Sequence, residues 1–273
     1  MYKLILFSIL LNKKIREKDL LSKANDLTFK ILLSLFPLLI FFMTIVAFLE
    51  LDIYYLARGL EGTVPLEVLS IFDLFLVEVV GTKRPSLLST SLIFAIASST
   101  SGFKSLVEAI NKAYDEEDKR SFIKVYALSF IMVVAFIFSL VVSIILLIFG
   151  NSIITALEIY FYMPPFMPTA FKILSNVVSI IVMLITTILI NKLAISRKVT
   201  LKSLLPGSLF TVVIWVIAST AFSLYISTFG RMASIYGSVA GIMILMIWVN
   251  IICIVLIIGT AMNAMLDDYK EKK

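Results

Sequence analysis

Residues 236–266 read YGSVAGIMILMIWVNIICIVLIIGTAMNAML, a run of 31 residues without a charged side chain. A helix rises 1.5 Å per residue, so about 20 residues cross the ~30 Å hydrocarbon core of a bilayer. A segment in lipid must satisfy its own backbone hydrogen bonds, which favours a helix. The run therefore predicts a transmembrane helix that tilts or projects beyond the lipid.

Five more apolar stretches resemble this one in length and composition. The chain is 60% hydrophobic and 15% charged, whereas soluble domains average about 45–50% and 25%. A β-barrel would require shorter segments of alternating polarity. We therefore predict an all-α, polytopic membrane protein, with residues 1–273 forming a single integral membrane domain. Its six transmembrane helices are expected at residues 29–49, 87–107, 125–149, 173–190, 204–229 and 236–266.

The lysines and arginines are distributed unevenly between these stretches. Nineteen of the 24 fall before the first span, between spans two and three, between spans four and five, or after the last span. Cytoplasmic connections of membrane proteins carry such an excess of cations. Both termini are therefore predicted to be cytoplasmic. No basic cluster is interleaved with aromatic residues, so we expect no nucleic-acid partner.

Two shorter apolar stretches are predicted to lie along the membrane surface. Residues 4–11 are followed at once by Asn12, Lys13 and Lys14, without the cleavage site of a signal peptide. We therefore predict that residues 4–11 form an interfacial helix, which belongs to a cytoplasmic N-terminal segment of residues 1–28. Residues 64–80 contain three carboxylates, which are costly in lipid. We expect an external interfacial helix there; the alternative, a seventh span, would invert every later orientation.

Several classes of catalytic site are disfavoured by the residues present. The chain has no histidine, and its one cysteine, Cys253, has no partner for an intramolecular disulfide. No glycine-rich phosphate-binding loop occurs. The acidic run at residues 115–118 could hold a cation, but flanking lysine and arginine favour a solvated loop. We therefore predict no catalytic residues, no metal, no cofactor and no enzymatic activity.

Polar residues inside the apolar stretches are the best functional candidates, because lipid makes them expensive. The candidates for lining a cavity are Asn250 in the last span and Ser98, Ser99 and Ser101 in the second. The alternative is structural: an interhelical hydrogen bond from Asn250, worth ~0.6–2 kcal/mol, and close helix packing at the serines.

Glycine and proline mark candidate packing and kink positions. At ~100° per residue, Gly237, Gly241 and Gly259 share nearly one face of the last span, and Asn250 lies on the opposite face. Small residues with this spacing let helices approach closely. Pro37 removes a backbone donor from the first span and is expected to kink it.

Four short motifs follow one another along the chain. They are Leu33-Ser34-Leu35-Phe36-Pro37; Ala109-Ile110-Asn111-Lys112-Ala113-Tyr114 with Arg120-Ser121-Phe122; Leu205-Pro206-Gly207; and Ile235 to Gly241 with Trp248 and Gly259 to Asn263. Taken in order, these motifs resemble those of the YihY/BrkB family. Thr260 and Met262 depart from the family pattern. The resemblance implies a six-helix protein of the bacterial inner membrane. Some members carry a virulence label, and the family once carried the name ribonuclease BN, but it supplies no catalytic residue to transfer.

Two functions are consistent with these residues. The first is a transporter or translocator of a lipid or another small amphipathic molecule, with membrane lipids as partners. Neutral hydroxyls and amides in the spans suit a polar head group, and residues 64–80 with the proline-rich loop at 163–168 could cover the outer side. The alternative is a non-transporting membrane scaffold, in which the same polar groups join helices. A membrane enzyme is the least supported interpretation.

Overall fold

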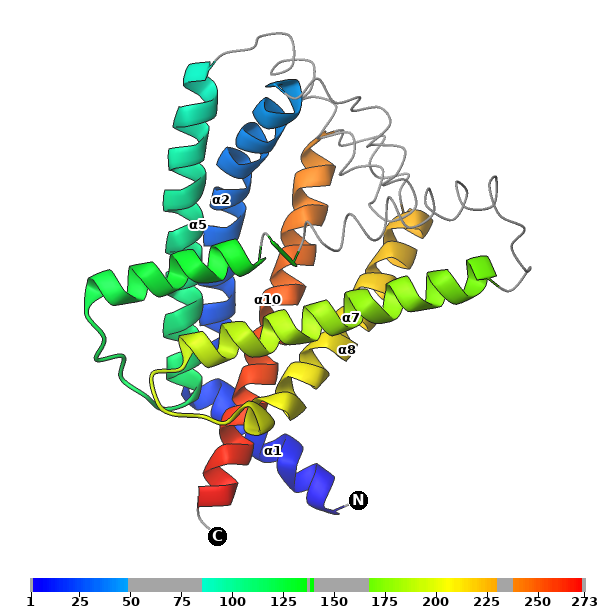
Figure 1. Cartoon of the computed structure of the whole chain (residues 1–273). Helices are drawn as coiled ribbons and strands as arrows, with labels where there is room; N and C mark the ends of the chain where they lie inside the picture. The colour runs from blue at the N-terminus through cyan, green and yellow to red at the C-terminus, as the bar shows by residue number, and fades with distance from the viewer. Residues whose placement is uncertain (1, 49–84, 137, 140–166, 230–237, 272–273) are drawn as a thin grey trace.

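The structure is a computed structural model that describes residues 2–48, 85–136, 138–139, 167–229 and 238–271 (Figure 1). These residues form seven helices. They are α1 (Tyr2–Glu17), α2 (Leu20–Phe48), α5 (Pro85–Ala113), the helix Phe122–Phe136, α7 (Met167–Ala194), α8 (Leu201–Phe229) and α10 (Ser238–Glu271).

The predicted all-helical architecture is confirmed for the described residues. Three helices are long and apolar enough to cross a membrane: α7 over Asn176–Ala194, α8 over Leu201–Phe222 and α10 over Ile242–Tyr269. The spans expected at 29–49 and 87–107 coincide largely with α2 and α5. Residues 64–80, the expected external helix, lie outside the described residues.

Most helices extend beyond the expected spans. The helix α2 begins at Leu20 rather than at 29, and α10 ends at Glu271 rather than at 266. Hydropathy marks only the apolar part of a helix, whereas backbone hydrogen bonding continues into polar turns. The prediction of a proline-rich loop over 163–168 was wrong at its end, because α7 already begins at Met167. Pro168 fits there, since amides in the first turn have no partner within the helix.

The helices α2, α5 and α10 pack together, and α8 packs against α10 and α7 (Figure 1). The helix Phe122–Phe136, drawn in green, crosses α5 instead of running beside it. Phe136 contacts Phe103 with ring centroids 6.0 Å apart, and Lys104 lies 5.1 Å from the ring of Phe122. This described part of the expected third span, 125–149, is therefore oriented differently from α5 (Figure 1).

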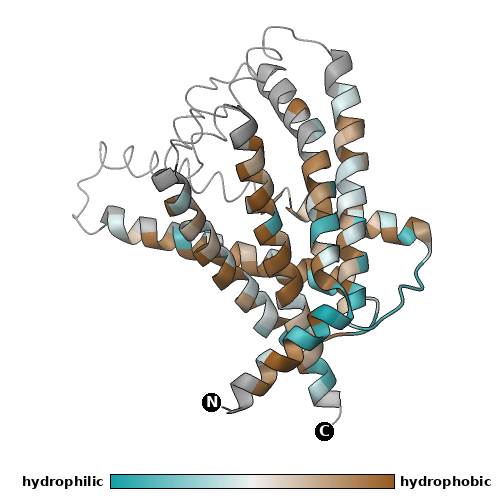
Figure 2. Ribbon diagram, turned by 180° about the vertical axis from the view of Figure 1, so that it is seen from behind, coloured by the Kyte–Doolittle hydropathy of each residue, from teal (hydrophilic) through white to brown (hydrophobic). Residues whose placement is uncertain are grey.

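Both chain termini lie at one end of the molecule (Figure 1). The connection between α5 and the helix Phe122–Phe136, and the connection between α7 and α8, lie at the same end. Hydrophilic residues gather there, while the upper parts of the helices are mainly hydrophobic (Figure 2). We call this end the polar end.

The buried core of the described residues is concentrated towards the polar end. Its fully buried members include Leu27 of α2, Ile110 of α5, Ala194 of α7 and Ile257 of α10. Small alanines are frequent in this core and allow the helices to approach closely. The fold thus brings four helix ends, from distant parts of the chain, into one packed region.

Candidate functional site

A set of polar side chains joins the helix ends within this core. We call it the polar junction; it consists of Asn111, Arg120, Asn191, Thr260 and Asn263. The three asparagines and Thr260 are each at most 2% exposed. Buried amides and hydroxyls of this kind are stable only when they are hydrogen-bonded, and each of these is.

Asn111 and Arg120 hold the C-terminus of α7. Asn111 Nδ2 donates to the carbonyl of Ala194 at 2.9 Å, and its Oδ1 accepts from the amide of Ser196 at 2.8 Å. Arg120 donates to the carbonyls of Leu193 and Ala194 at 3.0 and 2.6 Å. The last carbonyls of a helix have no partner within it, and a cation is favourable beside them. These two side chains therefore cap α7.

Arg120 is itself held in place by a carboxylate. Its Nε and Nη2 donate to the two oxygens of Asp118 at 2.7 and 2.6 Å. Such a two-pronged pair fixes the guanidinium plane. Hydrogen bonds from Arg120 also hold the pKa of Asp118 below its ordinary value.

Asn263 and Thr260 connect α10 to its two neighbours. Asn263 Oδ1 accepts from the amide of Gly207 at 2.6 Å, and its Nδ2 donates to the carbonyl of Leu204 at 2.9 Å. Both partners lie in the first turns of α8. Thr260 donates to Asn191 Oδ1 of α7 at 2.8 Å. The polar junction thus fixes the register of α7, α8 and α10 against one another.

Glycines permit this close contact between α8 and α10. A Cβ added at Gly259 would collide with the hydroxyl of Thr211 and lie 2.6 Å from the carbonyl oxygen of Gly207. A Cβ added at Gly207 would lie 2.5 Å from Asn263 Cγ. Gly259, a candidate packing residue, therefore sits at a tight helix crossing.

The other candidates from the sequence are placed along the helices. Asn250 Nδ2 donates to Asn25 Oδ1 at 2.9 Å and to Thr28 Oγ1 at 3.1 Å, both on α2. Ser98 donates to the carbonyl of Phe94 on its own helix at 2.6 Å.

Ser99 and Ser101 are partly buried on α5, and α2 continues through Pro37 to Phe48. Gly241 lies in α10, and Gly237 lies outside the described residues. None of the predicted cavity residues lines the pocket described next.

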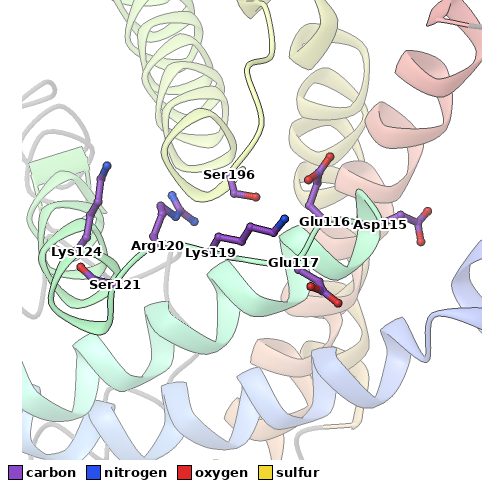
Figure 3. Close-up of a pocket in the computed structure, with 8 residues that line it drawn as sticks. All are labelled: Asp115, Glu116, Glu117, Lys119, Arg120, Ser121, Lys124 and Ser196. Atoms are coloured by element: carbon purple, nitrogen blue, oxygen red, sulfur yellow. The ribbon is translucent and has the colours of Figure 1, made fainter.

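A pocket of about 740 Å³ opens beside the polar junction, between the segment that follows α5 and the connection that follows α7 (Figure 3). It is lined by Asp115, Glu116, Glu117, Lys119, Arg120, Ser121, Lys124 and Ser196. Lys124, Ser121 and Arg120 lie on one side, the three carboxylates lie on the other, and Lys119 extends between them (Figure 3). The pocket therefore carries both signs of charge, separated across its width.

Asp115 belongs to a second set of ion pairs that ties α1 to the polar end. Lys14 of α1 lies 3.4 Å from Asp115 and 2.8 Å from Asp268, and Lys18 also pairs with Asp115. Burial raises the pKa of Asp115, but the hydrogen bond from Lys18 and the charge of Lys14 lower it overall. Asp115 also has a positive φ of 58° at the end of α5, a conformation that Asp tolerates better than most residues.

The acidic run does not converge on one point. Asp115 faces Lys14 and Lys18, and Asp118 faces Arg120. In the described part of the chain, no group of three His, Cys, Asp or Glu is close enough to hold a metal ion. The arrangement instead suits a polar molecule that carries charge.

The sequence predicted a solvated loop for the acidic run at residues 115–118, part of which lines the pocket, and it predicted no role for the residues of the polar junction. Three of the segments that resemble the YihY/BrkB pattern meet there, through Asn111 and Arg120, Gly207, and Gly259 with Asn263. Their quoted motifs were a signal that these residues matter. Asn191 had only a weak signal, as one amide at the end of an apolar stretch.

Comparisons with known proteins agree with this resemblance. Residues 11–273 match the family model described as virulence factor BrkB. A protein of Bacillus subtilis (strain 168), YfkH, whose name describes it as ribonuclease-like, is 33% identical over 252 residues. The match covers 92% of this chain and 91% of that protein.

Two UPF0761 membrane proteins match shorter segments. The one from Pseudoalteromonas translucida (strain TAC 125) is 35% identical over 28% of this chain and 26% of its own length. The one from Pasteurella multocida (strain Pm70) is 32% identical over 38% of this chain and 32% of its own length. No solved structure matches the chain.

Proposed function

The chain belongs to the BrkB family of bacterial membrane proteins, and we propose that it translocates an amphipathic molecule, such as a lipid, across the bilayer. It is a multi-pass protein of the inner membrane. In the proposed function, the polar head of the molecule enters at the polar end and its apolar part remains in lipid.

One observation carries this proposal: the charged pocket adjoins a helix with an apolar outer face. The pocket includes Ser121, and the helix Phe122–Phe136 begins at the next residue. Ile123 is 80% exposed and Ile131 is 51% exposed on that helix. Exposed apolar surface of this kind is suited to lipid, and a charged hollow beside it is suited to a head group. The proposed site lies at the membrane boundary and does not include Asn250.

The proposed topology has six spans with both termini in the cytoplasm. Support comes from the shared position of the termini and of the cation-bearing connections at the polar end. Single cysteines can be introduced at positions 117 and 164 in a Cys253→Ala background. A membrane-impermeant thiol reagent should label position 164 from outside and position 117 only after permeabilisation. Labelling of both positions from the same side would contradict the six-span topology.

Translocation is tested by reconstitution into liposomes. Purified protein should accelerate the exchange of an acyl-labelled fluorescent phospholipid between leaflets, measured by dithionite quenching. Arg120→Gln and Lys124→Gln should lower the rate, while Lys13→Gln, a change on exposed α1, should leave it unaltered. Failure to accelerate exchange for any phospholipid in a broad panel would refute the proposal.

The scaffold alternative has its own support. Asn250 joins α10 to α2, and the polar junction joins three further helices, so many polar groups in the described residues lock the fold. A scaffold predicts no lipid exchange but stable co-purification with another envelope protein. We further propose that the chain is not a nuclease, since it lacks histidine as a general base; degradation of labelled RNA by the pure protein would contradict this.

A further inference from the structure

We propose that the charged pocket binds a zwitterionic head group that contains a phosphate and a primary ammonium, as in a phosphoethanolamine lipid. This inference rests on the proposed function and names its substrate class. The acyl chains would lie along the outer face of the helix Phe122–Phe136.

Some charged side chains of the pocket are paired with one another or with α1, and others are not. Asp118 pairs with Arg120, and Asp115 pairs with Lys14 and Lys18. The other four charged side chains of the pocket, Glu116, Glu117, Lys119 and Lys124, have no ion-pair partner among the described residues. Two positive and two negative groups remain, so their sum is zero. An anionic ligand would meet two opposing carboxylates, whereas a zwitterion matches both signs.

The positive and negative side chains of the pocket lie mostly on opposite sides. Lys124 and Ser121 lie on one side of the pocket and Glu116 and Glu117 on the other (Figure 3). The cationic side also includes the first turn of the helix Phe122–Phe136, whose free amides favour an anion. A phosphate is therefore favoured beside Lys124, and an ammonium group beside Glu116 and Glu117. Lys119 extends between the two sides, with its ammonium directed towards the carboxylates (Figure 3).

The hydroxyl oxygen of Ser196 is buried and has no hydrogen-bond partner among the described residues. The backbone amide of Ser196, in contrast, donates to Asn111. Buried hydroxyl groups in native proteins nearly always have a partner. Ser196 lines the pocket between Arg120 and Glu116 (Figure 3), so an oxygen atom of the bound head group would supply the acceptor that the hydroxyl lacks.

The outer face of the helix Phe122–Phe136 offers an apolar surface for the acyl chains. Along the helix Phe122–Phe136, Ser129 and Met132 are fully buried towards the bundle. Ile123, Ile131 and Val134 face outward and are at least half exposed. These positions recur at helical spacing, so one apolar stripe starts at the pocket and runs away from it. A lipid, unlike a soluble phosphate ester, would use both the pocket and this stripe.

The test measures binding of acyl-labelled phospholipids to the full-length protein in detergent micelles. The probes carry phosphoethanolamine, phosphocholine or phosphoglycerol head groups. The phosphoethanolamine lipid should bind about tenfold more tightly than the other two, as expected for one charge-assisted hydrogen bond. Soluble glycerophosphoethanolamine should compete weakly; if it binds as tightly as the lipid, the assignment of a lipid ligand is wrong.

Two variants separate the ends of the head group. Glu116→Gln should weaken the phosphoethanolamine lipid most, because that lipid also loses an N–H hydrogen bond, and should remove its preference, while Lys124→Gln should weaken all three lipids. Lys13→Gln and Glu17→Gln are matched controls, because these residues are 66% and 60% exposed on α1, away from the pocket. The inference is overturned if wild-type protein binds the three lipids equally, or if the pocket variants behave like the α1 controls.

The outcomes also distinguish this inference from the proposed function. Selective binding without leaflet exchange would support the site and contradict translocation. Leaflet exchange without head-group selectivity would support translocation and contradict the site.

Discussion

Replacing Gly259 by alanine should separate α8 from α10 and destabilise the polar end. The added Cβ would collide with the hydroxyl of Thr211 and lie 2.6 Å from the carbonyl oxygen of Gly207, where ordinary contact begins at 3.4 Å. Both neighbours belong to helix α8, and the carbonyl is backbone, so the helices must move apart. Overpacking of this kind costs about 1–3 kcal/mol.

The same movement weakens hydrogen bonds of the polar junction. Asn263 bonds to Gly207 at 2.6 Å and to Leu204 at 2.9 Å, and each such bond contributes about 0.5–1.5 kcal/mol. The total loss in the free energy of unfolding is therefore about 2–4 kcal/mol. At ~2–4 °C per kcal/mol, the melting temperature should fall by roughly 5–15 °C.

Thermal unfolding in detergent measures this loss, and Gly102→Ala is the matched control. Gly102 is also a buried helical glycine, but an added Cβ there meets no heavy atom closer than 3.9 Å. The control should be neutral or slightly stabilising, because alanine favours helix over glycine by ~1 kcal/mol. Thr211→Ala combined with Gly259→Ala should recover part of the loss. The reasoning is refuted if Gly259→Ala and Gly102→Ala melt at the same temperature.

Three further predictions concern individual polar contacts. Arg120→Lys should lower the free energy of unfolding by about 1–3 kcal/mol in chemical denaturation, because lysine lacks the planar fork that joins Asp118 to two carbonyls; unchanged stability would contradict the capping role. The lowered pKa of Asp118 stabilises the fold above the ordinary aspartate value of about 3.9, and this contribution should disappear as pH falls through the lower folded value. A melting series should show that Asp118→Asn removes this acid-sensitive component. Asn250→Leu should cost about 1 kcal/mol, at ~0.6 kcal/mol for each of its two interhelical hydrogen bonds in a membrane, and less than Asn263→Leu, which leaves a buried backbone amide and a carbonyl of α8 unpaired; the reverse order would contradict the placement of these residues.

Helical periodicity predicted which side chains share a face of α10, but it did not predict which residues those side chains contact. Helical periodicity put Gly259 and Asn250 on opposite faces, and in the structure Gly259 faces α8 while Asn250 bonds to α2. The choice between a cavity and a helix contact for Asn250 could not be made from α10 alone, because it depends on what the neighbouring helix presents. In the structure, Asn250 bonds to Asn25 and Thr28 in the polar first turns of α2.

Composition alone also did not predict where the helices begin and end. The polar turns from Leu20 onward belong to α2, although their composition is not that of a membrane span. They remain helical because core packing at Leu20, Ala24 and Leu27 stabilises the helix beyond its apolar part.

The sequence by itself determined that this chain is an α-helical membrane protein, because insertion into lipid depends on the length and composition of contiguous segments. It also grouped most cations on alternate connections, which follows from residue order alone. Only the tertiary structure decided which polar groups meet. Asn111 and Ala194 are 83 positions apart, and Gly207 and Asn263 are 56 apart. Such pairs depend on how whole helices cross, and that crossing is a property of the assembled bundle.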